Sequence, residues 1–113
     1  MIIEEICNWN EERGLATAPI DVSLEYEMIK EELIELLVAD TRVDVADAFG
    51  DIIFVAIGSL YKLTKDVDKV KDIMLAITAA NNLKGKDTLS GKITKPEDFV
   101  GPESMIKGIL DGR

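Results

Sequence analysis

The chain has 113 residues, of which 47% are hydrophobic and 31% charged, and its formal net charge is −9. This composition is typical of one globular domain with a single core and excludes a disordered chain. The excess of acids argues against nucleic acids and anionic membrane surfaces as partners, and the longest apolar run, 52–60, is too short to cross a bilayer.

The charge is unevenly distributed along the chain. Residues 1–60 contain fourteen acidic and three basic residues, whereas residues 61–113 contain eight acidic and ten basic ones. Four lysines fall within twelve residues of the second half: Lys84, Lys86, Lys92 and Lys95. This lysine segment is either a solvated loop or a site for phosphate, and the acids of the first half are either solvated faces or a site for metal.

The chain contains one cysteine, Cys7, and no histidine. An internal disulfide is therefore excluded, and Cys7 is expected to pack in the core of a protein from a reducing compartment. The N-terminal MIIEEICNW carries acids where a signal peptide needs basic residues, so a cytoplasmic location is expected. Without histidine, zinc sites of the His kind, His-based triads and di-iron bundles with ExxH motifs are also excluded.

Helical spacing of apolar residues predicts a first helix over 2–13, ended by Gly14. Ser23 is a suitable N-cap for a second helix, with Glu25 in its first turn, that runs to about Val38. The apolar arc of this helix consists of Tyr26, Ile29, Leu33, Leu36 and Leu37. A separate arc carries an EExxE sequence formed by Glu31, Glu32 and Glu35.

The third predicted helix, 42–63, is apolar on all sides except along one line of acids. Asp44, Asp47 and Asp51 fall within about 60° of one another at the helical repeat. A short break at 40–41 predicts that this helix packs antiparallel on the second one, which brings the EExxE row to the level of Asp47 and Asp51. Gly50 and Gly58 inside the helix suggest a close approach of a neighbouring helix.

A fourth helix is predicted over 67–83, capped by Asp66. Its inward residues are Val67, Val70, Ile73, Met74 and Ile77. The segment 85–102 has no periodicity, and Pro102 is suited to open a short last helix, 103–110. The prediction is a single domain, 1–113, with an all-α fold of four or five antiparallel helices. Because the third helix needs more cover than one chain provides, we expect a homodimer or a dimer of dimers.

Acids gathered on an apolar helix need compensation. Two carboxylates repel by roughly 3 kcal/mol at 5 Å and an effective dielectric constant near 20. They must bind protons, bind cations or stay in water. Hard divalent cations prefer such oxygen ligands and commonly hold phosphates as well. A metal–phosphate site with Mg²⁺, or Mn²⁺ in its place, is therefore the specific interpretation, and solvated helix faces are the alternative.

Three sequence features together resemble the all-α NTP pyrophosphohydrolases. They are EExxE, the aspartate-containing VADAFGDIIFVAIGSL, and NNLKG followed by SGKITKPEDFVGP, within residues 23–102. That superfamily includes MazG-like proteins, dimeric dUTPases and phosphoribosyl-ATP pyrophosphohydrolases, with compact members in phages and bacteria. The resemblance implies Mg²⁺-dependent hydrolysis of a nucleoside triphosphate between its α- and β-phosphates, in control of nucleotide pools or removal of non-standard nucleotides.

The resemblance also implies roles for individual residues. Glu32 and Glu35 match metal ligands, and Glu31 matches a leading acid that orients or deprotonates the attacking water. Asp51 matches the aspartate of an ExxD motif, whose glutamate is here replaced by Ala48. Asp47, four residues before Asp51, is the nearer substitute as a ligand, and Asp44 on the same line is a further candidate. The implied substrate-binding residues, in and beside the loop 85–102, are Asn81, Lys84, Lys92 and Lys95.

Two functions are therefore compared below. The first is a nucleotide pyrophosphohydrolase with Mg²⁺ as cofactor. The second is a non-catalytic, acidic helical oligomer that binds a basic partner through its negative face.

Overall fold

The structure, a computed structural model, describes residues 1–86, 93–95 and 99–112. Within these ranges it contains five α-helices and one pair of two-residue strands. The prediction of an all-α fold with four or five helices is confirmed. The chain divides into two compact units, Met1–Val67 and Asp68–Arg113, and each is described by itself.

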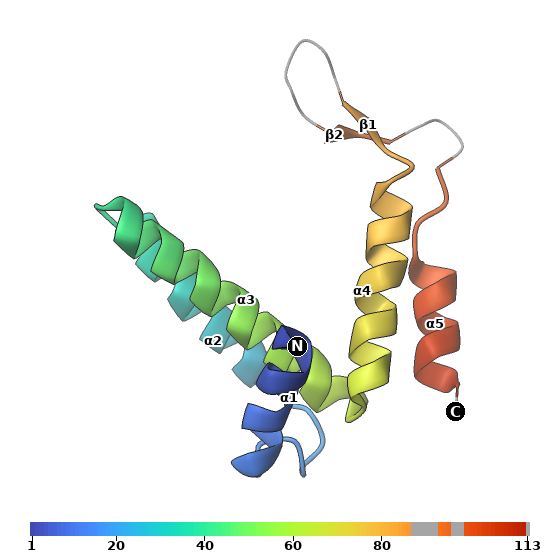
Figure 1. The fold of residues 1–113 in the computed structure, drawn as a ribbon, viewed down its shortest axis with the longest axis horizontal. Helices are drawn as coiled ribbons and strands as arrows, with labels where there is room; N and C mark the ends of the chain where they lie inside the picture. The colour runs from blue at the N-terminus through green and yellow to red at the C-terminus, as the bar shows by residue number, and fades with distance from the viewer. Residues whose placement is uncertain (87–92, 96–98, 113) are drawn as a thin grey trace. The chain divides into compact units, whose positions relative to one another are not determined.

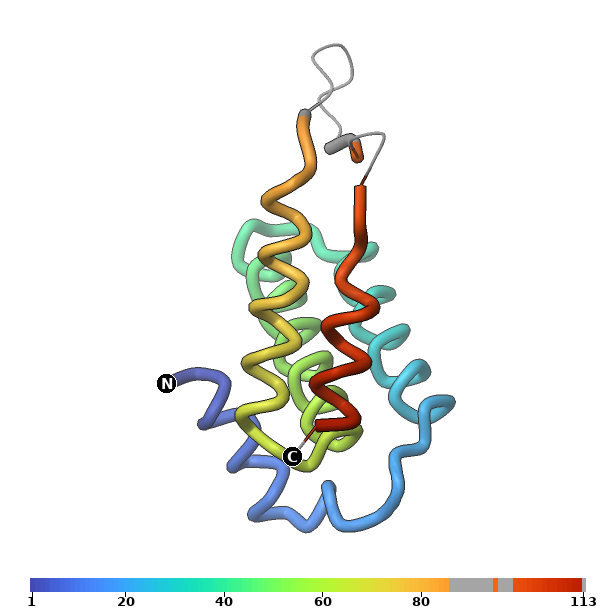
Figure 2. Tube along the Cα trace, turned by 90° about the vertical axis from the view of Figure 1, so that its right-hand side faces the viewer, coloured from blue at the N-terminus to red at the C-terminus, as the bar shows by residue number. Residues whose placement is uncertain are grey.

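The first unit contains α1 (Ile2–Glu12), α2 (Val22–Leu37) and α3 (Arg42–Thr64). As predicted, α2 and α3 form an antiparallel hairpin, visible side by side in Figures 1 and 2, and α1 packs against α3. The buried apolar side chains of the unit are Ile6, Cys7, Ala16, Ala48 and Tyr61. The predicted packing role of Cys7 is confirmed.

The end of α1 shows why Gly14 is needed. Gly14 has a φ of 65°, which favours glycine, and its N–H donates to the Glu11 carbonyl at 3.0 Å. The next N–H, of Leu15, donates to the Asn10 carbonyl at 3.0 Å. These two hydrogen bonds form a Schellman motif, which satisfies carbonyls that the last turn leaves free.

The N-cap of α2 differs from the prediction. Asp21, not Ser23, is the cap, and its carboxylate accepts a hydrogen bond from the Leu24 N–H at 3.2 Å. Ser23 lies inside the first turn because the helix already begins at Val22. Asp and Ser are equally suitable caps, so the sequence alone did not separate them.

Several apolar side chains that the sequence assigned to the interior are exposed. In α2, Tyr26, Leu33 and Leu37 are exposed, with Leu37 83% accessible. In α3, the helix expected to be buried on all sides, Phe49 and Ile53 are also more than half accessible. A single hairpin with one covering helix leaves these faces open, and the expected homo-oligomer stays a prediction.

The second unit contains most of α4 (Val67–Asn81), β1 (Gly85–Lys86), β2 (Ile93–Thr94) and α5 (Glu103–Asp111). α4 ends two residues before the predicted Leu83. The strands pair antiparallel with Gly85 opposite Thr94, a short ladder that the sequence did not predict. α4 and α5 run antiparallel beside each other in Figures 1 and 2.

The C-terminal end of α5 is tied to α4 by Lys69, whose Nζ donates to the carbonyl of Gly112 at 3.0 Å. The buried residues of α4 are Val70, Ile73, Ala76 and Ala80, whereas Met74, predicted to point inward, is 37% accessible. The small alanines were missed because their low hydrophobicity contributes little to an apolar pattern. None of the helices in the described ranges combines the length and hydropathy that crossing a membrane requires.

Candidate metal centre and adjoining cavity

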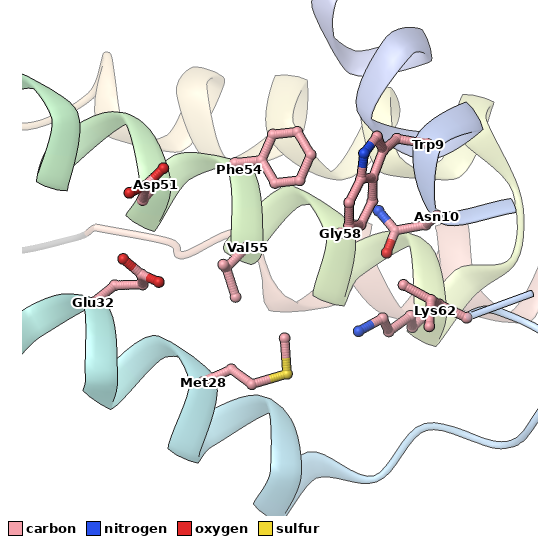
Figure 3. A pocket seen from close by; sticks show the side chains of 10 residues that line it. Trp9, Asn10, Met28, Glu32, Asp51, Phe54, Val55, Gly58 and Lys62 are labelled. Carbon is pink, nitrogen blue, oxygen red and sulfur yellow. The ribbon is translucent and has the colours of Figure 1, made fainter. Parts of the chain in front are cut away.

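Three predicted metal ligands meet between α2 and α3. One carboxylate oxygen each from Glu32, Glu35 and Asp51 lies within 4.8 Å of the other two. Glu32 and Glu35 share one face of α2 because they are three residues apart, and the antiparallel packing of α3 brings Asp51 to them. Figure 3 shows Glu32 and Asp51 facing each other across the hairpin. We call these three residues the acidic cluster.

Glu32 is the most perturbed member of the acidic cluster. The pKa of Glu32 is raised from 4.5 to about 7. The largest cause is a side-chain hydrogen bond with Glu35, which forms only when one of the two carboxylates carries a proton, and the second cause is burial. The negative charges of Glu35, Asp51 and Glu31 raise this pKa further. Its Oε2 is buried and has no hydrogen-bond partner within the part of the chain that the structure describes. The cluster therefore favours a bound proton or cation.

The other predicted acids lie beside the acidic cluster and not in it. Glu31 is exposed but close enough for its charge to act on Glu32. Asp44 and Asp47 are exposed and line a neighbouring hollow of about 250 Å³ together with Glu35 and Asp51. Glu35 and Asp51 thus belong to both features, and a second cation would find oxygen ligands in this hollow.

The second unit brings two of the predicted substrate-binding lysines together. The Nζ atoms of Lys84 and Lys95 each lie 5.5 Å from the centroid of the Phe99 ring, within cation–π range. Asn81 is exposed at the end of α4, and its carbonyl accepts a hydrogen bond from the Lys84 N–H at 3.0 Å. Lys92 lies outside the described residues. Phe99 was missed by the sequence analysis, although an aromatic residue close to several lysines was an available signal.

A cavity of about 310 Å³ adjoins the acidic cluster in the first unit. Its walls are Trp9, Asn10, Leu15, Met28, Glu32, Asp51, Phe54, Val55, Gly58 and Lys62. Trp9 and Phe54 meet edge to face, with ring centroids 5.1 Å apart and planes at 82°. Figure 3 shows the two acids at one end of this cavity and Asn10 and Lys62 at the other. The cavity thus has charged or polar groups at both ends and apolar side chains between them.

The far end of the cavity contains an ion pair that the sequence did not predict. Lys62 Nζ lies 3.1 Å from both carboxylate oxygens of Glu25, and the Ser59 hydroxyl donates to Glu25 at 2.7 Å. Glu25, which the sequence analysis placed in the first turn of α2, is buried at 6% accessibility. No feature of the sequence indicated that Glu25 and Lys62, which are 37 positions apart, would pair.

Comparison with known proteins identifies the family. The family model of phosphoribosyl-ATP pyrophosphohydrolase matches residues 11–81, a range that includes the acidic cluster and the neighbouring Asp44 and Asp47. No curated protein matches the chain. The family indicates a pyrophosphohydrolase, in agreement with the resemblance of the EExxE and aspartate motifs. The matched range covers more than half of the chain. The chain therefore belongs to the phosphoribosyl-ATP pyrophosphohydrolase family, within the MazG-like all-α NTP pyrophosphohydrolase superfamily.

Proposed function

We propose that the chain is a Mg²⁺-dependent nucleoside triphosphate pyrophosphohydrolase that cleaves between the α- and β-phosphates. The observation that carries this proposal is the convergence of Glu32, Glu35 and Asp51, in a pyrophosphohydrolase family, with a buried Glu32 oxygen that no described residue hydrogen-bonds. The products are a nucleoside monophosphate and pyrophosphate. Such an activity suits control of nucleotide pools or removal of non-standard nucleotides in the cytoplasm.

The residues of the acidic cluster fit a hard divalent cation. All three supply carboxylate oxygens, which Mg²⁺ prefers and Mn²⁺ accepts. Ligation would give the Glu32 Oε2 a partner and would remove the repulsion that raises its pKa. The chemistry that a cation supplies there is charge neutralisation on the phosphates and a lower pKa for the attacking water. Asp47 and Asp44 are the proposed ligands of a second cation.

Glu31 is the proposed catalytic base. It is exposed beside the acidic cluster, where it can orient a water molecule and accept its proton. The water oxygen forms a new bond to one phosphorus of the α–β bridge, and the bond from that phosphorus to the bridging oxygen breaks. The bridging oxygen leaves with the other phosphorus, so that the nucleoside monophosphate and pyrophosphate separate, and Glu31 passes the proton to solvent.

The lysines are proposed to bind the substrate's phosphates. Lys84 and Lys95 gather positive charge around Phe99, which suits a polyphosphate. Asn81 and Lys92 are assigned to the same role by the resemblance of their motifs.

A second candidate substrate follows from the matched family. Phosphoribosyl-ATP, the compound in the family's name, also carries a triphosphate on a nucleoside. The acidic cluster would bind the phosphates of either compound in the same way, so the two candidate substrates differ in how their nucleoside parts are bound. Both candidates therefore belong in one assay.

The test is a substrate panel with the full chain. Ribo- and deoxyribonucleoside triphosphates and phosphoribosyl-ATP are incubated with Mg²⁺ or with EDTA, and released pyrophosphate is measured. Release with Mg²⁺ from at least one compound supports the proposal. No release from any of them, together with no Mg²⁺-induced rise in melting temperature, would favour the acidic oligomer that binds a basic partner.

A further inference from the structure

The proposed hydrolysis leaves one charged residue of the 310 Å³ cavity without a role. Lys62 lies at the end of the cavity opposite Glu32 and Asp51 (Figure 3). Its side chain is 12% accessible and that of its partner Glu25 is 8% accessible. Burying two charges is costly unless the geometry is good, and hydrophobic residues of similar size would fill such a place more simply.

The ion pair fixes Lys62 tightly and leaves it one donor. A lysine ammonium has three N–H donors, and both Glu25 oxygens lie 3.1 Å from Nζ. Ser59 donates to Glu25 at 2.7 Å and so fixes the carboxylate. No other residue in the described ranges takes the third N–H of Lys62, which lines the cavity.

The charge balance indicates what this donor would bind. Glu25 neutralises Lys62, so the pair attracts a polyphosphate far less than a free ammonium would. Between the ion pair and the acids, the cavity walls are Met28, Phe54 and Val55 (Figure 3). An uncharged, partly aromatic group with a hydrogen-bond acceptor fits these surroundings, and the phosphates fit the acidic end.

We infer that Lys62 is a substrate-contacting residue that donates a hydrogen bond to an uncharged acceptor of the nucleoside part, with Glu25 and Ser59 as its positioning residues. The inference rests on the proposed function for the placement of the phosphates at the acidic cluster. A purely structural role, in which the pair only fixes α2 against α3, predicts no effect on ligand affinity once the variant folds.

The test compares two variants of the full chain that differ only at Lys62. Lys62→Met alone would leave Glu25 buried and charged, so Glu25→Gln is combined with it to remove both charges and keep a partner for Ser59. Glu25→Gln alone retains the lysine donor and is the matched control. Circular dichroism establishes that each variant is folded, and Lys107→Met, an exposed lysine of α5, controls for loss of surface charge.

The probes are the ribo- and deoxyribonucleoside 5′-monophosphates and inorganic tripolyphosphate, each titrated by calorimetry with Mg²⁺ present. We expect Glu25→Gln/Lys62→Met to bind the preferred monophosphate about tenfold more weakly than Glu25→Gln does, as for one lost hydrogen bond to a charged donor. Affinity for tripolyphosphate should stay within about twofold between the double variant and the wild type, because positions 25 and 62 together carry no net charge in either protein. If Glu25→Gln does not fold, the double variant is compared with the wild type.

Equal monophosphate affinity in the two variants would overturn the inference, as would a loss confined to tripolyphosphate. Failure of the wild type to bind any monophosphate at millimolar concentration would overturn it too. Hydrolysis by the wild type is measured separately. A wild type that binds monophosphates but hydrolyses no triphosphate would contradict the proposed function and still decide the role of Lys62.

Discussion

The phenolic hydroxyl of Tyr61 on α3 donates a 2.7 Å hydrogen bond to the carboxylate of Glu11 on α1. This hydrogen bond, followed by burial, raises the pKa of Tyr61 from 10 to about 12. Because the pKa is higher in the folded state, the stabilisation is fully present below about pH 10 and is lost as the pH rises through about 12. The pair therefore couples the N-terminal helix to the hairpin in a pH-dependent way.

Replacing Tyr61 by Phe should lower the free energy of unfolding by about 1–2 kcal/mol at pH 8. The difference between wild type and Tyr61→Phe should shrink between pH 10 and 12. Urea unfolding of both proteins across this range measures it. A difference between the two proteins that stays constant from pH 8 to 12 would contradict the raised pKa of Tyr61.

Metal-free protein should lose stability as the pH rises from about 4.5 to 7. The pKa of Glu32 is raised to about 7 in the folded state, so folding retains a proton there that the unfolded chain releases. The proposed Mg²⁺ would replace this proton, so its effect on the melting temperature should be larger at pH 8 than at pH 5.5. Thermal unfolding in EDTA measures the loss of stability with pH, and thermal unfolding in Mg²⁺ measures how the Mg²⁺ effect depends on pH. Glu32→Gln should remove both pH dependences. A Mg²⁺ effect independent of pH would contradict this prediction.

Glu35→Gln and Asp51→Asn should each reduce pyrophosphate release at least 100-fold, because each removes one ligand charge from the acidic cluster. The helical circular dichroism should be unchanged, since both side chains are exposed. Asp40→Asn, in the turn between α2 and α3, is the matched control and should keep wild-type activity. Full activity in both cluster variants would show that the site lies elsewhere.

The two glycines of α3 should respond differently to alanine. A Cβ at Gly58 would lie 3.0 Å from Asn10 Nδ2, whereas one at Gly50 would meet nothing within 4 Å in the described chain. Asn10 is buried and its Nδ2 donates to the Ile6 carbonyl at 2.9 Å, so it has little room to move. Gly50→Ala should stabilise the protein by up to about 1 kcal/mol. Gly58→Ala should be less stable than Gly50→Ala in chemical denaturation, and the reverse order would contradict the close approach.

The exposed apolar faces of α2 and α3 should be covered by a second copy of the chain. Light scattering should give the wild type a mass of at least twice its 12.5 kDa. Ile53→Lys places a charge on this surface, where Ile53 is 58% accessible, and should shift the mass toward that of one chain. A wild type that is monomeric at high concentration would disprove the homo-oligomer.

The sequence by itself determined the local features on which the site depends. EExxE fixes Glu32 and Glu35 on one face of a helix, because the helical repeat places residues three apart together. The short break after the second helix fixes an antiparallel hairpin, since so few residues cannot span back along its length. Gly14 marked a helix end because its conformation favours glycine. Each of these features depends only on residues that lie close together in the sequence.

Only the tertiary structure decided which distant residues meet. Asp51 joins Glu32 and Glu35, while Asp47 lies in the adjoining hollow, because the packing of α2 on α3 sets their relative register. The pairing of Glu25 with Lys62 depends on that same packing, and no local pattern encodes a contact across 37 positions. Burial likewise depends on what covers a helix, a property of the assembled chain rather than of any segment.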